Sequence, residues 1–287
     1  ANDEVKDGLS ERGGHPVERK RMRQWMMRIT AYADRLITSL DDLNWTDSIK
    51  EAQKNWVGRS DGASLRFSGA GNASNSVVEV FTTRPDTVFG VSFMVLAPEH
   101  ELVSMFTSDE QKKDVEEYII STSRKSERER QGEKEITGIA LGGHVIHPLS
   151  GNEIPVYIAD YVLAGYGTGA IMAVPSGDER DWNFARHFSI EITSIFAGFD
   201  TNKEVCSDET AQLKNSGELD GLMKKEAIPT ALDILEAKGI GERRINYRLR
   251  DAVFSRQRYW GEPFPICYEN DIPKLIEDVT ITLPKVD

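Results

Sequence analysis

The sequence predicts an α+β protein, in which a β-rich domain with peripheral helices follows an N-terminal helical segment. Apolar residues within 16–43 recur at steps of three and four, which is typical of an amphipathic helix. After Gly58 the pattern changes to alternation, and β-branched and aromatic residues fill the runs 64–67 and 77–81. A helical pattern returns at 178–188, so helices are expected beside the strands.

The N-terminal segment predicts two helices. The first is expected over 16–43 and begins at Pro16, because proline suits the first turn of a helix. A shorter helix is expected over 47–55, with the Thr46 hydroxyl as its cap. The change of period after Gly58 marks the predicted domain boundary. The apolar stripe of the first helix consists of Trp25, Ile29, Tyr32, Leu36 and Leu40.

Short strands joined by polar loops are expected after this boundary. A loop rich in glycine, serine and asparagine at 68–76 separates the first two strands, and Pro85 interrupts the ladder because it has no backbone N–H. The charge-dense segment 108–130 is predicted to be a helix. The predicted strands are 64–67, 77–81, 88–96 and runs within 136–158 that Gly142-Gly143 and 148–151 interrupt.

Two polar segments indicate a functional site. Residues 81–90 read Phe-Thr-Thr-Arg-Pro-Asp-Thr-Val-Phe-Gly, which places hydroxyls, a guanidinium and a carboxylate at a strand end. Residues 165–185 combine a glycine-rich loop, a short apolar strand and a capped helix. Asp178 and Asp181 are three residues apart in this helix, so their carboxylates share one face. An ordinary polar hairpin turn and simple helix capping are the alternative interpretations.

These two segments closely resemble the editing domain of leucyl-tRNA synthetase of the bacterial type, the CP1 insertion that hydrolyses mischarged tRNA. The flanks agree, since 23–36 and 55–60 resemble the segment that leads into the insertion, and 248–265 resembles the return to the class I catalytic body. The resemblance implies a β-barrel-like editing domain. Its implied divisions are a helical connector at 1–57, the editing domain at 58–245 and a return segment at 246–287.

Some of the matching residues are shared with other synthetases. The isoleucine and valine enzymes also have the Thr-Thr-Arg-Pro opening and the Gly-Thr-Gly-Ala loop, so an editing domain of either stays an alternative. The leucine enzyme is favoured by residues 86–90, by 95–100 and by 172–175 followed by Asp178 and Asp181. Gly177 stands where many relatives carry a histidine.

The resemblance implies roles for single residues. Thr82 and Thr83 are expected to contact the terminal adenosine and the scissile ester, and Asp181 to bind the α-ammonium of the amino acid. These three are the predicted catalytic residues, and Asp181 is expected to be a surface carboxylate that matters little for stability. Thr87 is expected to guard the side-chain pocket. The predicted substrate-binding residues are Arg84, Asp86, Thr87, Tyr166, Gly169, Met172, Val174 and Asp178, although Arg84 and Asp86 pairing with each other is an alternative.

Composition limits the partners. The net charge of −12 argues against a general nucleic-acid binder, so RNA contact is expected to be local, through the arginine-rich stretches 19–28 and 243–258. The alternative for these stretches is a solvated surface paired with carboxylates. The expected partners are the 3′-terminal adenosine of tRNA(Leu), carrying an amino acid, and the remainder of the synthetase. No membrane partner is expected, because no apolar run is long enough to span a bilayer.

Cofactors and compartment follow from the same residues. Only Cys206 and Cys267 are present, which fits a reducing cytoplasm, and the first residues suggest an excised piece of a longer protein. His144 and His147 lack a third ligand nearby, so a structural role is expected and no metal is predicted. No cofactor is expected for editing. The resemblance assigns ATP and Mg²⁺ to the full-length synthetase only, and the amino-acid activation motifs of class I synthetases are missing here.

The expected chemistry is hydrolysis of a labile ester by water. No Ser-His-Asp or Cys-His arrangement indicates a covalent nucleophile, so positioning and electrostatic stabilisation are expected to supply the catalysis. The resemblance implies norvaline, isoleucine and methionine as the misattached amino acids. A non-catalytic module that connects domains or binds the tRNA end is the alternative function.

Overall fold

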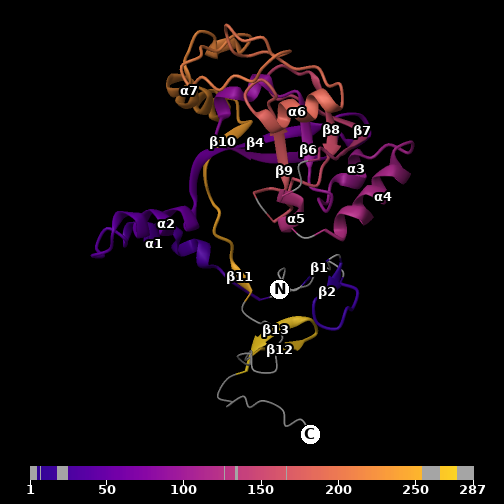
Figure 1. Cartoon of the computed structure of the whole chain (residues 1–287), viewed down its shortest axis with the longest axis vertical. Coiled ribbons are helices and arrows are strands. Elements are labelled where there is room, and N and C mark those ends of the chain that lie inside the picture. The colour runs from indigo at the N-terminus through magenta and orange to yellow at the C-terminus, as the bar shows by residue number, and fades with distance from the viewer. Residues whose placement is uncertain are drawn as a thin grey trace. The chain divides into compact units, whose positions relative to one another are not determined.

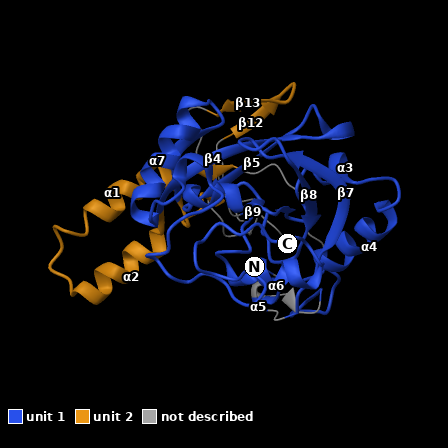
Figure 2. Ribbon diagram, turned by 90° about the horizontal axis from the view of Figure 1, so that it is seen from above, with its two compact units in different colours: residues 1–19, 60–246 blue, residues 20–59, 247–287 orange. Residues whose placement is uncertain are grey.

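The computed structural model describes residues 5–6, 8–17, 25–125, 127–132, 135–165, 167–253 and 266–276. The chain divides into two compact units, one of residues 1–19 with 60–246 and one of residues 20–59 with 247–287 (Figure 2). The three-part division at 57/58 and 245/246 stays a prediction. No helix in these described ranges is both long and apolar enough to cross a membrane.

A seven-stranded sheet organises the larger unit (Figure 1). Its order is β10-β4-β7-β8-β6-β9, and β5 pairs with β4. The β6–β8 pair is parallel, whereas β4–β5, β4–β7, β7–β8 and β6–β9 are antiparallel. The strands are β4 (Arg59–Gly69), β5 (Val77–Thr82), β6 (Phe93–Leu96), β7 (Ile139–Ile146), β8 (Glu153–Ile158), β9 (Ala170–Ala173) and β10 (Gly241–Tyr247).

The predicted α+β class is confirmed, because helices precede, separate and follow the strands along the chain. The expected barrel-like sheet is not a closed barrel in the described strands. Strands β5 and β9 lie close to each other, but within the described strands no hydrogen-bonded pair closes the sheet into a ring.

Two hydrophobic clusters cover the two faces of the sheet. Successive side chains of a strand point to opposite faces, so β6 contributes Met94 and Leu96 to the larger cluster and Phe93 and Val95 to the smaller one. Helix α6 (Glu179–His187) packs on the smaller cluster through Phe184, whose ring stacks on Phe93 at 5.0 Å. Burial of one such side chain is worth about 1.5–3 kcal/mol. The first turn of α6 is joined to the end of β9 by the hydrogen bond from the Val174 N–H to Asp181 Oδ2.

The remaining helices of the larger unit surround the sheet. Helix α7 directs Ala227, Ala231 and Leu235 into the larger cluster, because residues four apart share a helix face. These helices are α3 (Val103–Phe106), α4 (Lys112–Ser123), α5 (Glu127–Gly132) and α7 (Lys224–Ala237), with 3-10 helices η3 (Gly71–Ala73), η4 (Pro85–Gly90) and η5 (Gly217–Leu219). A two-stranded sheet of β1 (Val5–Lys6) and β2 (Leu9–Ser10) also belongs to this unit.

The smaller unit contains short elements. Gly58 ends helix α2 with φ of 60°, a left-handed conformation that glycine adopts without a steric penalty. The predicted change of period at this residue therefore coincides with a true helix end. The elements are β3 (Met26–Met27), η2 (Ile29–Tyr32), α1 (Ala33–Thr38), α2 (Asp47–Val57), β11 (Ala252–Val253), β12 (Ile266–Glu269) and β13 (Ile272–Leu275).

The long helix predicted over 16–43 is wrong in the described residues. Met26 and Met27 form β3, which pairs with β11, and helical structure covers only η2 and α1. The cause is tertiary: Asp251 accepts hydrogen bonds from both the backbone N–H and the hydroxyl of Thr30. Contacts with a segment more than 200 residues away therefore override the local helical period.

Two smaller expectations also need correction. Val88 and Phe89 lie in η4 and not in a strand, because Pro85 starts a tight turn that Thr87 closes on the Arg84 carbonyl. The segment 81–90 is not a hairpin, since β6 pairs with β8 and β9. The predicted helix at 47–55 is confirmed as α2, but Thr46 does not cap it, because its hydroxyl contacts the hydroxyl of Ser48.

Candidate active site

A cavity of about 440 Å³ lies where the end of β5, η4, β9 and the start of α6 meet. It brings together eight of the predicted site residues from segments about 90 residues apart. These are Thr82, Thr83, Arg84, Thr87, Met172, Val174, Asp178 and Asp181. The two polar segments identified in the sequence therefore line one cavity.

A bidentate ion pair holds the first loop. Arg84 donates from Nε to Asp86 Oδ1 at 2.9 Å and from Nη2 to Asp86 Oδ2 at 2.8 Å. Asp86 is 0% exposed, and it is absent from the cavity wall. Asp86 thus holds the turn, as the alternative interpretation proposed, whereas Arg84 both pairs with it and lines the cavity.

Thr87 is fixed by its own turn. Its hydroxyl donates to the Arg84 carbonyl at 2.9 Å, and its backbone N–H donates to the same oxygen at 3.1 Å. A threonine has only a few χ1 positions, and this bond selects one of them. Because the hydroxyl is used by the backbone, the methyl group is the branch left to contact a ligand.

Asp181 is a buried carboxylate and not the surface group that was expected. It is 7% exposed, and its Oδ2 accepts a hydrogen bond from the Val174 N–H at 2.8 Å. Burial, followed by the negative charge of Asp178, raises the pKa of Asp181 to about 7. The other oxygen, Oδ1, accepts no hydrogen bond from the described residues. It is the oxygen available to a cationic ligand.

Asp178 caps helix α6. Its Oδ1 accepts the N–H of Asp181 at 3.0 Å, so the capping interpretation is confirmed for this residue. Asp178 also lines the cavity and is exposed. Asp178 can both cap the helix and line the cavity because the first turn of α6 forms part of the cavity wall.

Gly169 is a predicted residue that does not line the cavity. Gly169 has φ of 72°, and a side chain there would meet Ala164 Cα and His100 Cδ2 at 3.2 Å, so its role in the structure is to allow a tight turn. Tyr166 lies outside the described residues. Gly177 lines the cavity, and an added Cβ would lie 3.1 Å from Phe196.

The sequence reasoning missed part of the wall. Tyr161, Ile171, Glu179 and Arg180 also line the cavity. Tyr161 follows β8, and its hydroxyl is buried without a hydrogen-bond partner in the described part of the chain. Burial raises the pKa of this hydroxyl well above its ordinary value. The sequence position of Arg180 could have indicated its place in the wall, because it lies between Asp178 and Asp181 in the first turn of the predicted helix.

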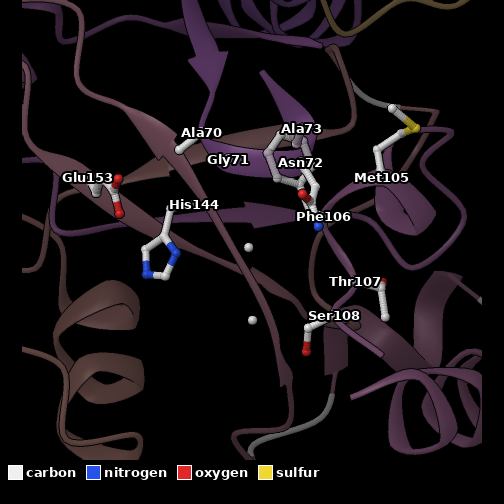
Figure 3. A pocket seen from close by; sticks show the side chains of 12 residues that line it. Ala70, Gly71, Asn72, Ala73, Met105, Phe106, Thr107, Ser108, His144 and Glu153 are labelled. Carbon is white, nitrogen blue, oxygen red and sulfur yellow. The ribbon is translucent and has the colours of Figure 1, made fainter. Parts of the chain in front are cut away.

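The histidines 144 and 147 have separate surroundings. His147 is buried, its Nε2 lies 2.9 Å from the Val88 carbonyl, and its Nδ1 accepts from the N–H groups of Leu149 and Ser150. His144 lines a different cavity of about 200 Å³, with Glu153 beside it and Ser108 across the cavity (Figure 3). Among the described residues, no group of three His, Cys, Asp or Glu side chains could hold a metal ion.

Comparison with known proteins decides the family. A family model described as "Leucyl-tRNA synthetase, editing domain" matches residues 54–236, which include every residue of the cavity wall. The chain belongs to the leucyl-tRNA synthetase editing-domain family. The leucine–tRNA ligases of Porphyromonas gingivalis and Flavobacterium johnsoniae are 51% and 53% identical to it, and both alignments cover 100% of this chain.

The structural comparison agrees with the sequence comparison. A LeuRS of Agrobacterium radiobacter K84, solved in a ternary complex with tRNA and LeuAMS, superposes with a TM-score of 0.75 at 35% identity. That match covers 98% of this chain and 33% of the Agrobacterium chain. The chain spans about a third of the length of the curated leucine–tRNA ligases it matches, 32% and 31% for the two named above. It therefore corresponds to the editing region of a leucyl-tRNA synthetase and not to the whole enzyme.

Proposed function

We propose that this chain hydrolyses the ester bond of mischarged tRNA(Leu), releasing norvaline, isoleucine or methionine, and that it spares leucyl-tRNA. The observation that carries the proposal is the cavity of about 440 Å³ in which the buried Asp181 and the fixed Thr87 line the same wall. An aminoacyl ester carries an α-ammonium beside a variable side chain. A site for this ester needs an anion that binds the α-ammonium and a pocket whose shape admits some side chains and excludes others.

In this proposal Asp181 binds the α-ammonium. A charge-assisted hydrogen bond to Oδ1 favours the ionised carboxylate, so the bound cation lowers a pKa that burial has raised to about 7. The Val174 N–H, 2.8 Å from Oδ2, holds the carboxylate in place before the substrate arrives. The site is therefore preorganised, which lowers the cost of orienting the ester.

Thr82 and Thr83 are proposed to contact the ester and the ribose of the terminal adenosine. Thr82 Oγ1 accepts the Arg84 N–H at 3.0 Å, so its hydroxyl proton remains free to donate. A water molecule is proposed to attack the ester carbonyl without a covalent enzyme intermediate. Tyr166 and the loop 167–170, with Met172 and Val174, are proposed to form the adenosine shelf and the pocket wall.

Thr87 is proposed to exclude leucine. A binding pocket discriminates one methylene by only about 10- to 200-fold, a range established for aminoacyl-tRNA synthetases. A second site that hydrolyses the errors is then needed, and it must reject the correct product. The remainder of the synthetase, with its ATP and Mg²⁺, is proposed to supply the aminoacylation activity.

The proposal is tested by deacylation of defined substrates. Transfer RNA for leucine is charged with radiolabelled norvaline, isoleucine or leucine, and loss of the ester is followed with and without the chain. We expect norvalyl- and isoleucyl-tRNA to be hydrolysed well above the spontaneous rate while leucyl-tRNA persists. Binding of the tRNA end without acceleration of hydrolysis for any amino acid would instead support a non-catalytic binding module.

A further inference from the structure

A second cavity adjoins the candidate active site. Its volume is about 510 Å³, and its wall includes Arg130, Glu135, Asp160 and Asn183. Three residues, Tyr161, Glu179 and Arg180, line both cavities. These three residues therefore mark the boundary between two neighbouring cavities.

Arg180 lies at this boundary. Its Cζ lies 5.1 Å from the centroid of the Tyr161 ring, which holds the guanidinium by a cation–π interaction. Within the described ranges it makes no hydrogen bond or ion pair, and it is exposed. A guanidinium has five N–H donors in a planar array that matches two oxygens of a phosphate.

Arg130, the other arginine of the second cavity, is fully used by the fold. It donates from Nε to the Asp160 carbonyl at 2.6 Å, from Nη1 to Glu99 at 2.6 Å and from Nη2 to the Val162 carbonyl at 2.8 Å. The side chain of Arg130 is 0% exposed. Arg130 thus shapes the wall, and Arg180 is the arginine available to a ligand.

The carboxylates of the second cavity restrict what it can hold. Lys125 neutralises Asp160 at 3.1 Å, whereas Glu135 and Glu179 have no ion-pair partner in the described part of the chain. Unpaired carboxylates repel a second phosphate and accept hydrogen bonds from amino and hydroxyl groups. A nucleoside, with its ribose hydroxyls and exocyclic amine, has that chemistry.

We propose that Arg180 binds the phosphodiester that joins the terminal adenosine to the preceding nucleotide, and that this nucleotide occupies the second cavity. The inference rests on the proposed function, because it extends the bound tRNA end by one residue. The Tyr161 ring positions the guanidinium, and the two cavities together recognise the last two nucleotides.

The experiment compares norvalyl esters of increasing length: adenosine, adenosine 5′-monophosphate, the dinucleotide CpA and full tRNA(Leu). Arg180→Ala is expected to lower kcat/KM about 10- to 100-fold on the three substrates that contain the phosphate, and to leave norvalyl-adenosine within about twofold. The Arg180 charge lowers the pKa of Asp181, so the comparison is made at pH 8, above the wild-type value of about 7, where the effect of Arg180 on the ionisation of Asp181 is reduced. In the wild type, CpA is expected to react better than adenosine 5′-monophosphate, since only CpA fills the second cavity.

Arg186→Ala is the matched control. Arg186 lies on the same helix and stacks on the Trp182 ring at 5.0 Å, but it lines neither cavity. The two variants change the net charge equally, and only Arg180→Ala is expected to reduce the salt dependence of tRNA binding, by about 0.7 in the slope of log K against log salt.

The outcomes separate the two proposals. A wild-type chain that hydrolyses norvalyl-tRNA while Arg180→Ala matches it on every substrate would overturn the role of Arg180. An equal loss of activity on norvalyl-adenosine and on norvalyl-CpA would also overturn the role of Arg180, because norvalyl-adenosine has no phosphate. Equal reactivity of CpA and adenosine 5′-monophosphate in the wild type would overturn the second cavity as a nucleotide site. Absence of wild-type hydrolysis on all four substrates would reject the proposed function itself.

Discussion

Asp181→Asn is expected to reduce deacylation of norvalyl-tRNA by about 30-fold or more, because loss of one partner of a buried charge pair costs about 2–5 kcal/mol. Asparagine keeps an oxygen for the Val174 N–H, which now donates to Asp181 Oδ2 at 2.8 Å. Alanine would leave that donor unpaired and confuse a loss of stability with a loss of function. Single-turnover rates with charged tRNA measure the effect.

The same substitution is expected to stabilise the fold above neutral pH. The pKa of Asp181 is raised from 3.8 to about 7, so between these values the folded chain keeps a proton that the unfolded chain has lost. The free energy of unfolding therefore falls as pH rises from about 4 to about 7 and stays lower above it. Asp181→Asn removes this loss, with an expected gain of about 1–3 kcal/mol at pH 8 and almost none at pH 4.

Denaturant unfolding of the wild type and of Asp181→Asn at pH 4 and pH 8 tests whether the substitution stabilises the fold only at the higher pH. Asp200→Asn is the control, because Asp200 is a loop carboxylate whose pKa is lowered by its hydrogen bond with Lys203. Its replacement is expected to leave deacylation unchanged and to give no gain in stability at pH 8. An Asp181→Asn protein that is less stable than the wild type at pH 8 and hydrolyses norvalyl-tRNA normally would contradict the assigned role.

Wild-type activity should follow the same ionisation. Binding of an ammonium needs ionised Asp181, so kcat/KM on norvalyl-tRNA, corrected for spontaneous hydrolysis, is expected to rise as pH increases through about 7. It should fall again where the substrate amine loses its proton, near the ordinary α-amino pKa of about 8. In the Asp181→Asn variant, kcat/KM is expected not to rise as pH increases through about 7.

Thr87→Ala is expected to make leucyl-tRNA a substrate. The Thr87 side chain is buried at the cavity wall, and its hydroxyl is bound to the Arg84 carbonyl at 2.9 Å, so its methyl group is a fixed obstruction. Its removal is expected to add about 1–3 kcal/mol to transition-state binding of leucine, the usual value of a methyl-sized fit. Deacylation of norvalyl- and isoleucyl-tRNA should persist.

Two conservative variants separate the methyl group from the hydroxyl. Thr87→Ser keeps the hydrogen bond and removes the methyl group, so leucyl-tRNA should again be hydrolysed. Thr87→Val keeps the branched shape, so leucyl-tRNA should stay protected even if the turn is weakened. Protection of leucyl-tRNA by Thr87→Ala and Thr87→Ser, in proteins that still hydrolyse norvalyl-tRNA, would place the gate elsewhere, with Met172 and Val174 the next candidates.

Local sequence patterns predicted much of this site because its chemistry is local. The helix at 178–188 appears as α6, and the spacing of Asp178 and Asp181 brings both to one cavity. The strands within 136–158 appear as β7 and β8, with the irregularity between Ala140 and His144 near the predicted glycines. The catalytic and binding roles of the site residues stay predictions.

Features set by distant packing could not be read from the sequence. Asp181 is buried on helix α6, and Phe184 of the same helix stacks against Phe93, a residue that is far away in the chain. Tyr161 reaches the cavity from the end of β8, and no local pattern links it to Arg180. The β3–β11 pair likewise joins opposite ends of the chain, which is why the helix predicted over 16–43 failed there.

The most direct test of the account is a crystal structure of the chain with a norvalyl-adenosine analogue whose ester is replaced by an amide. We expect the analogue in the cavity formed by β5, η4, β9 and α6, with its ammonium about 3 Å from the Asp181 carboxylate and its side chain toward Thr87. An analogue bound elsewhere, or one whose ammonium faces away from Asp181, would contradict the proposed editing site.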